Sequence, residues 1–115
     1  MSENKNTLLQ INNYGMGNGD AELGLSLIQN YFKLLLQEDA LPTVIAFYNG
    51  GVKLVAEGSP VIETLQKIES KGVKLIACKT CLNHFGLMDK VKVGMGGTMI
   101  DIITLQKEAA KVITL

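Results

Sequence analysis

Two cysteines lie three residues apart, as Cys78-Lys79-Thr80-Cys81, and the sequence contains no other cysteine. The only histidine, His84, follows three residues later. A thiolate can attack a substrate, hold a transferred sulfur, form a disulfide or bind a soft metal ion. Nearby positive charge favours the thiolate form, and Lys79 and His84 are the neighbouring residues that can supply it. The candidate chemistry of the chain is therefore concentrated in residues 78–84.

The cysteines follow an apolar run that predicts a buried strand over Val73–Cys78. The next segment, Leu82–Gly86, can open a helix. A strand end followed by a helix is a common place for functional side chains in sheets of parallel strands. This position favours chemistry over simple packing for the two thiols.

Several interpretations of the pair remain open. A sulfur carrier would hold a transferred sulfur on one thiol, and the other thiol could displace it as a disulfide forms. A thioredoxin-like redox pair is a second possibility. The sequence does not support a thioredoxin-like site, which has a Trp before the motif and a cis-Pro loop opposite it. The chain has no Trp, and both prolines, Pro42 and Pro60, stand at the entry to a strand or helix. Two small buried hydrophobic residues would be the simplest explanation.

A metal site is the remaining interpretation. Cys78, Cys81 and His84 supply three soft ligands at short spacing. A closed tetrahedral zinc site needs four ligands, and the sequence offers no further Cys or His. A carboxylate, water or another subunit would have to complete it. We therefore expect no resident metal, and His84 is better explained as a neighbour that sets the thiol pKa.

Composition narrows the class of protein. A length of 115 residues with 47% hydrophobic residues predicts one globular domain over residues 1–115, with a flexible tail at 1–6. Eleven basic residues balance eleven acidic ones, and aromatic residues are few, so a nucleic-acid surface is not expected. We see no membrane span and no signal peptide, and expect a cytoplasmic protein with reduced thiols.

Apolar runs alternate with helical patterns along the whole chain. This alternation predicts an α/β fold, a three-layer α/β/α sandwich with a five-stranded, mainly parallel sheet. The helical segments are Ala21–Gln37 capped by Asp20, a turn at Val52–Val55, a helix from Ser59-Pro60 to Gly72, and a last helix capped by Thr98 and Asp101. The predicted strands are Thr7–Asn12, Thr43–Tyr48, Val73–Cys78, Lys90–Val93 and Lys111–Leu115.

Ligands of such sheets bind beyond the carboxyl ends of the strands. Four segments are predicted at that edge: Gly15–Asp20, Asn49-Gly50-Gly51, Cys78–Cys81 and Gly94–Thr98. The first of these glycine-rich turns matches neither the dinucleotide fingerprint nor a P-loop, so we expect no cofactor. The broad apolar arc of Ala21–Gln37 favours self-association as well as packing on the sheet.

With the cysteine pair and the glycine-rich segments in this order, the chain resembles the DsrE/DsrF-like family of small sulfur-handling proteins. Its nearest likeness is to the DsrE-like domain of the YedF group of sulfurtransferase-like proteins of selenium metabolism. The resemblance runs over nearly the whole chain and is strongest at Lys71–Leu82. It includes Gly19–Gly24, Asn49–Leu54, Gly58-Ser59 and Ala110–Ile113.

The resemblance implies a sheet sandwiched between helices and assembly into trimers or hexamers. In sulfur-relay members a cysteine after the corresponding strand accepts sulfur as a persulfide and hands it on, and Cys78 matches it. Cys81 matches a second cysteine of the selenium-linked group. The chain departs from the family pattern at Lys79, where a glycine is expected, and at Gly96-Gly97-Thr98-Met99, where an Asn usually precedes the Met.

We therefore expect a small cytoplasmic persulfide carrier, sulfurtransferase-like, that acts through Cys78 with Cys81 as a resolving or supporting thiol. It would be a stoichiometric carrier rather than a turnover enzyme, with separate donor and acceptor proteins as partners. The alternative is a non-catalytic oligomeric module that binds a metal or small ligand at Cys78, Cys81 and His84.

Overall fold

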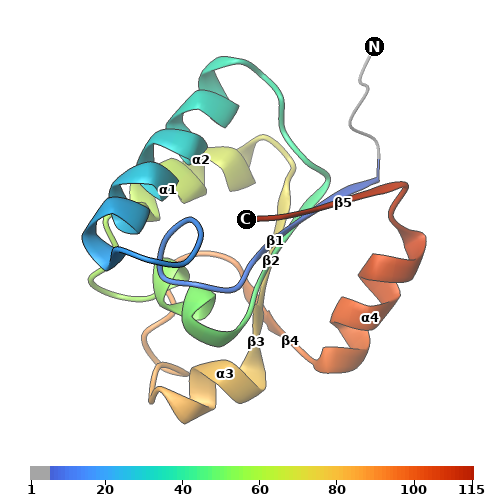
Figure 1. Ribbon diagram of the computed structural model, residues 1–115. Coiled ribbons are helices and arrows are strands. Elements are labelled where there is room, and N and C mark those ends of the chain that lie inside the picture. The colour runs from blue at the N-terminus through green and yellow to red at the C-terminus, as the bar shows by residue number, and fades with distance from the viewer. Residues whose placement is uncertain (1–5) are drawn as a thin grey trace.

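The computed structural model describes residues 6–115, which form one α/β domain around a single sheet. Figure 1 shows the arrangement of the elements. The strands are β1 (Thr7–Ile11), β2 (Val44–Phe47), β3 (Lys74–Cys78), β4 (Met95–Gly97) and β5 (Lys111–Thr114). The helices are α1 (Ala21–Gln37), the 3₁₀ helix η1 (Asn49–Val55), α2 (Ile62–Ser70), α3 (Lys79–His84) and α4 (Met99–Glu108).

All five strands are parallel, in the order β4-β3-β2-β1-β5, which confirms the predicted sheet. The register aligns Ile11 with Phe47 and Phe47 with Ala77, so the three central strands end together. Cys78 follows Ala77 directly and therefore lies at the carboxyl edge of the sheet.

Helices cover both faces of the sheet, as the predicted sandwich requires. Figure 1 shows α1 and α2 on one side and α4 on the other. The larger core lies on the side of α1, α2 and η1 and contains Ile28, Phe32 and Leu65. On the α4 side a smaller cluster contains Leu8, Val44 and Ala46, with Leu105 and Ala109 packed against it.

The predicted fourth strand over Lys90–Val93 is wrong. That segment runs beside the end of η1 instead, where Val91 forms an isolated antiparallel bridge with Ala56. The backbone N–H of Lys92 donates to the Val55 carbonyl at 2.8 Å. Val93 is buried in the main core, and Val91 packs against it. The backbone partners of this segment, Ala56 and Val55, lie outside the sheet.

The true fourth strand is the glycine connection that the sequence placed in a loop. Met95, Gly96 and Gly97 pair with Ile76, Ala77 and Cys78 of β3. A Cβ on Gly97 would lie 2.5 Å from Cγ2 of Ile76, so the close approach of β4 to β3 requires glycine there. The segment Gly94–Thr98 is therefore mostly strand rather than loop, and only its end, at Gly97 and Thr98, lies at the carboxyl edge.

Side-chain caps mark the starts of α1 and α4. Asp20 accepts a bond from the Leu23 N–H at 2.8 Å, and Thr98 and Asp101 form the predicted capping box of α4. The predicted start of α2 is shifted. The Ser59 hydroxyl accepts from the Val61 N–H at 3.2 Å, the bond an N-cap makes, but the helix itself begins at Ile62 because the backbone of Val61 is not helical.

The predicted tail at residues 1–6 lies outside the described residues except for Asn6. The Asn6 side chain donates to the Glu108 carbonyl at 3.0 Å, so this residue is held against the end of α4. None of the helices within residues 6–115 is both long enough and apolar enough to span a membrane.

Candidate functional site

The two cysteines occupy different elements. Cys78 is the last residue of β3 and also the N-cap of α3, with extended backbone angles. The helix begins at once with Lys79, three residues before the segment that the sequence indicated. Cys81 therefore lies in the first turn of α3, and the following Leu82 is buried in the core.

The two thiols differ in their access to solvent. Cys78 is 1% exposed and belongs to the main core, whereas Cys81 is partly exposed and packs against the edge of that core. Both are free cysteines. A molecule that approaches the carboxyl edge of the sheet therefore meets the sulfur of Cys81 first.

The partner of Cys81 is the backbone of η1. The Asn49 N–H donates a hydrogen bond to Cys81 Sγ at 3.0 Å. Asn49 has a φ of +51°, in the left-handed region that Asn tolerates better than most residues. Two positions later, a Cβ on Gly51 would collide with the Ile11 carbonyl oxygen, so η1 is pressed against the end of β1. Glycine at this position lets η1 reach the thiol.

Four influences act on the pKa of the Cys81 thiol. Burial is the largest and raises the pKa, because a thiolate loses hydration there. A hydrogen bond with Cys78 raises it further, the Asn49 N–H lowers it, and the charge of Cys78 raises it. The net effect is a raised pKa, so Cys81 is held mainly as a thiol at neutral pH, with Cys78 close enough to affect it.

The other two predicted site residues lie beside the pair without bonding to it. Lys79 is exposed, and its side chain lies along β4, where a Cβ on Gly96 would be 2.9 Å from its Cγ. Its charge adds a minor lowering to the pKa of Asp101, which is lowered mainly by hydrogen bonds from Thr98. The His84 ring packs edge-on against Phe85, with centroids 5.0 Å apart.

The described residues do not form the group of ligands that a metal-binding module would need. Among residues 6–115, no three His, Cys, Asp or Glu side chains come together where one ion could be held. His84 in particular does not join Cys78 and Cys81. Cys78, Cys81 and the Asn49 N–H form the candidate site.

All four segments predicted at the carboxyl edge have residues there. Asn49 bonds to Cys81, and a Cβ on Gly50 would lie 3.4 Å from the backbone nitrogen of Tyr14, which follows β1. The fourth segment, Gly94–Thr98, is mostly strand, and its Gly97 pairs with Cys78 at this edge. The role of Asn49 as a hydrogen-bond donor was not predicted, since a backbone N–H leaves no signal in residue type. Only its position after the second strand pointed to this edge.

Comparison with known proteins agrees with this architecture. Residues 5–115 match the DsrE/DsrF-like family, which is associated with sulfur relay. No curated protein sequence matches the chain. Among solved structures, the ychN protein from E. coli has a TM-score of 0.71 at 20% identity, with 100% of each chain covered.

Two further structures are similar. A protein of unknown function from Methanobacterium thermoautotrophicum has a TM-score of 0.67 at 20% identity, covering 95% of this chain and 97% of its own. A conserved protein of unknown function from Bacteroides thetaiotaomicron has a TM-score of 0.66 at 18% identity, with 100% of both chains covered. At these identities the likeness shows the fold. The match over residues 5–115 establishes that the chain is a member of the DsrE/DsrF-like family.

Proposed function

We propose that this chain is a sulfur-relay protein that carries sulfur as a persulfide on the Cys78–Cys81 pair. The observation that carries the proposal is the thiol of Cys81 at the carboxyl edge of the sheet. It is partly exposed, accepts the Asn49 N–H at 3.0 Å and has the second thiol beside it. The membership in a family associated with sulfur relay supports the same chemistry.

The chemical step needs only the thiol and a donor of sulfane sulfur. The Cys81 thiolate attacks the outer sulfur of a donor persulfide, R–S–SH. A new S–S bond forms on Cys81, the donor S–S bond breaks, and the donor leaves as the thiolate RS⁻. The raised pKa of Cys81 limits the thiolate fraction at neutral pH, and once formed such a thiolate is a strong nucleophile.

The exposure of the two residues favours Cys81 as the accepting thiol. Cys78 is 1% exposed and would serve as the supporting thiol, able to attack Cys81 Sγ, release HS⁻ and leave a disulfide. The expectation drawn from the family resemblance assigns the two roles in the opposite order. Lys79 and His84, which bond to neither sulfur, are proposed as contacts for incoming molecules.

Partners and assembly are part of this proposal. Donor and acceptor would be separate proteins or small molecules in the cytoplasm, where the free thiols stay reduced. Self-association as a trimer or hexamer is supported by large apolar side chains that α4 exposes. Ile100 is 74% exposed and Met99 56% exposed.

The proposal is tested by loading the reduced protein with sodium tetrasulfide, removing the excess and measuring the intact mass. We expect a gain of one sulfur that cyanide removes as thiocyanate, since cyanide attacks sulfane sulfur. Loss of two hydrogens by the wild type, together with no gain of sulfur by Cys78→Ser, would instead identify a redox pair. No change in mass, with both thiols still titratable, would reject the carrier function.

A further inference from the structure

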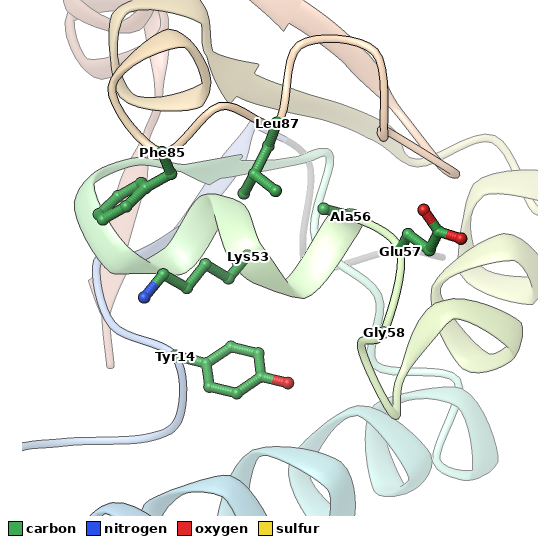
Figure 2. Close-up of a pocket in the computed structure, with 7 residues that line it drawn as sticks. All are labelled: Tyr14, Lys53, Ala56, Glu57, Gly58, Phe85 and Leu87. Carbon is green, nitrogen blue, oxygen red and sulfur yellow. The ribbon is translucent and has the colours of Figure 1, made fainter.

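A cavity of about 290 Å³ lies between η1 and the residues that follow it, the end of α3 and the loop after β1; neither cysteine lines it. This is at the lower end of the range for small-molecule sites, about 300–1,000 Å³. Figure 2 shows Lys53 and Tyr14 facing one part of it, with Phe85 and Leu87 on the opposite side of η1 from Tyr14. A cavity of this volume can hold a small molecule no larger than a peptide of a few residues.

The cavity lies about one helical turn from Cys81. Phe85 is four residues after Cys81, and its N–H donates to the Cys81 carbonyl at 3.1 Å, so the two side chains share one face of α3. One turn of an α-helix advances about 5.4 Å. On the other wall, Lys53 is four residues after Asn49 in the same 3₁₀ helix. Both elements that hold the thiol therefore continue into the cavity.

The lining combines an apolar surface with one cation. The Lys53 ammonium lies 4.5 Å from the centroid of the Phe85 ring, a cation–π arrangement that fixes the charge at the cavity. Within residues 6–115, no carboxylate forms an ion pair with Lys53. Glu57 lines the cavity further along, and Figure 2 shows its carboxylate away from the ammonium. The charge of Lys53 is thus available to an anionic ligand.

We propose that this cavity binds the organic part of a low-molecular-weight hydropersulfide that carries a carboxylate. Lys53 would bind the carboxylate, Phe85 and Leu87 would contact the carbon chain, and the terminal sulfur would reach Cys81. This inference rests on the proposed function and assigns its donor class. The transfer is R–S–SH plus the Cys81 thiolate giving RS⁻ and the Cys81 persulfide, so no oxidant is needed.

The test compares two donors across four proteins. Glutathione persulfide carries carboxylates, and 2-hydroxyethyl hydropersulfide is uncharged. The initial rate of sulfur loading is measured against donor concentration for the wild type, Lys53→Met, Lys53→Arg and Lys107→Met. Lys53→Met removes the charge but keeps an unbranched apolar side chain against Phe85. Lys107→Met is the control, because it removes one lysine charge from α4 on the other face of the sheet.

With glutathione persulfide, Lys53→Met should raise the concentration for half-maximal rate by about fivefold to tenfold, between the effects of exposed and buried charged contacts. Lys53→Arg should restore the wild-type value, and Lys107→Met should not change it. With the uncharged donor all four proteins should behave alike. Equal concentration dependence of wild type and Lys53→Met for glutathione persulfide would overturn the proposal.

A binding measurement separates this proposal from the proposed function. S-methylglutathione cannot transfer sulfur, and its affinity for the wild type and Lys53→Met can be measured by calorimetry. Weaker binding to Lys53→Met, in a protein that takes up no sulfur from any donor, would reject the carrier function and keep the cavity as a binding site for carboxylates. Absence of binding to the wild type would overturn the cavity proposal itself.

Discussion

The backbone N–H of Asn49 points at Cys81 Sγ from 3.0 Å and joins the start of η1 to the first turn of α3. The donor comes from a residue with φ of +51°, so its position depends on an unusual backbone conformation. The hydrogen bond favours the thiolate and opposes the burial that raises the Cys81 pKa. This contact makes Cys81, of the two cysteines, the one whose charge the backbone stabilises directly.

Substitution of Asn49 tests that contact. Asn49→Gly keeps both the N–H and the positive φ, so the Cys81 pKa should stay at the wild-type value. Asn49→Val disfavours the left-handed conformation and should cost about 2 kcal/mol of unfolding free energy relative to Asn49→Gly. It should also raise the Cys81 pKa, because the N–H is displaced. The pH dependence of alkylation by iodoacetamide reports the pKa, and equal profiles for the two variants would contradict the role of this bond.

Removal of the neighbouring thiol should have the opposite effect. Both influences of Cys78 on Cys81 raise the pKa of Cys81. Cys78→Ala should therefore lower that pKa and speed the alkylation of Cys81 at neutral pH. Thiolate absorbance near 240 nm, titrated in parallel, gives an independent value. A pKa that stays the same or rises would mean that the two sulfurs do not interact.

The glycines of β4 offer a matched pair for stability. A Cβ on Gly97 would lie 2.5 Å from the branched side chain of Ile76, which is buried. Gly97→Ala should cost about 1–3 kcal/mol of unfolding free energy, as other overpacked sites do. A Cβ on Gly96 would instead meet the flexible chain of Lys79, which can move away. Urea denaturation should show Gly96→Ala close to wild type, and an equal loss in both variants would argue against this packing.

Much of the fold follows from local sequence signals. The bounds of α1 match the predicted helix because Asp20 caps it and its apolar residues repeat at helical spacing. Strands β1, β2, β3 and β5 coincide with predicted apolar runs. Strand β4 escaped prediction because Met95-Gly96-Gly97 has no apolar pattern. Its place is set by contact with Ile76 and Lys79, which only the folded chain brings close.

The sequence predicted which residues form the candidate site, but only part of how they are arranged in space. The pattern placed both cysteines at the carboxyl edge, where the structure has them. It could not tell which thiol is exposed, because that depends on α3 beginning at Lys79 and turning Cys81 outward from the core edge. The positions of Lys79 along β4 and of His84 on Phe85 are likewise tertiary, and spacing along the chain gave no sign of them.

The measurement that tests the central claim most directly is the location of the transferred sulfur. Reduced wild type, Cys78→Ser and Cys81→Ser are each exposed to sodium tetrasulfide, blocked with an alkylating agent and digested with trypsin. Cleavage after Lys79 places the two cysteines in separate peptides. We predict one added sulfur on the Cys81 peptide in the wild type and in Cys78→Ser, and none in Cys81→Ser. Full sulfur uptake by Cys81→Ser, on the Cys78 peptide, would contradict the assignment of Cys81 as the accepting thiol.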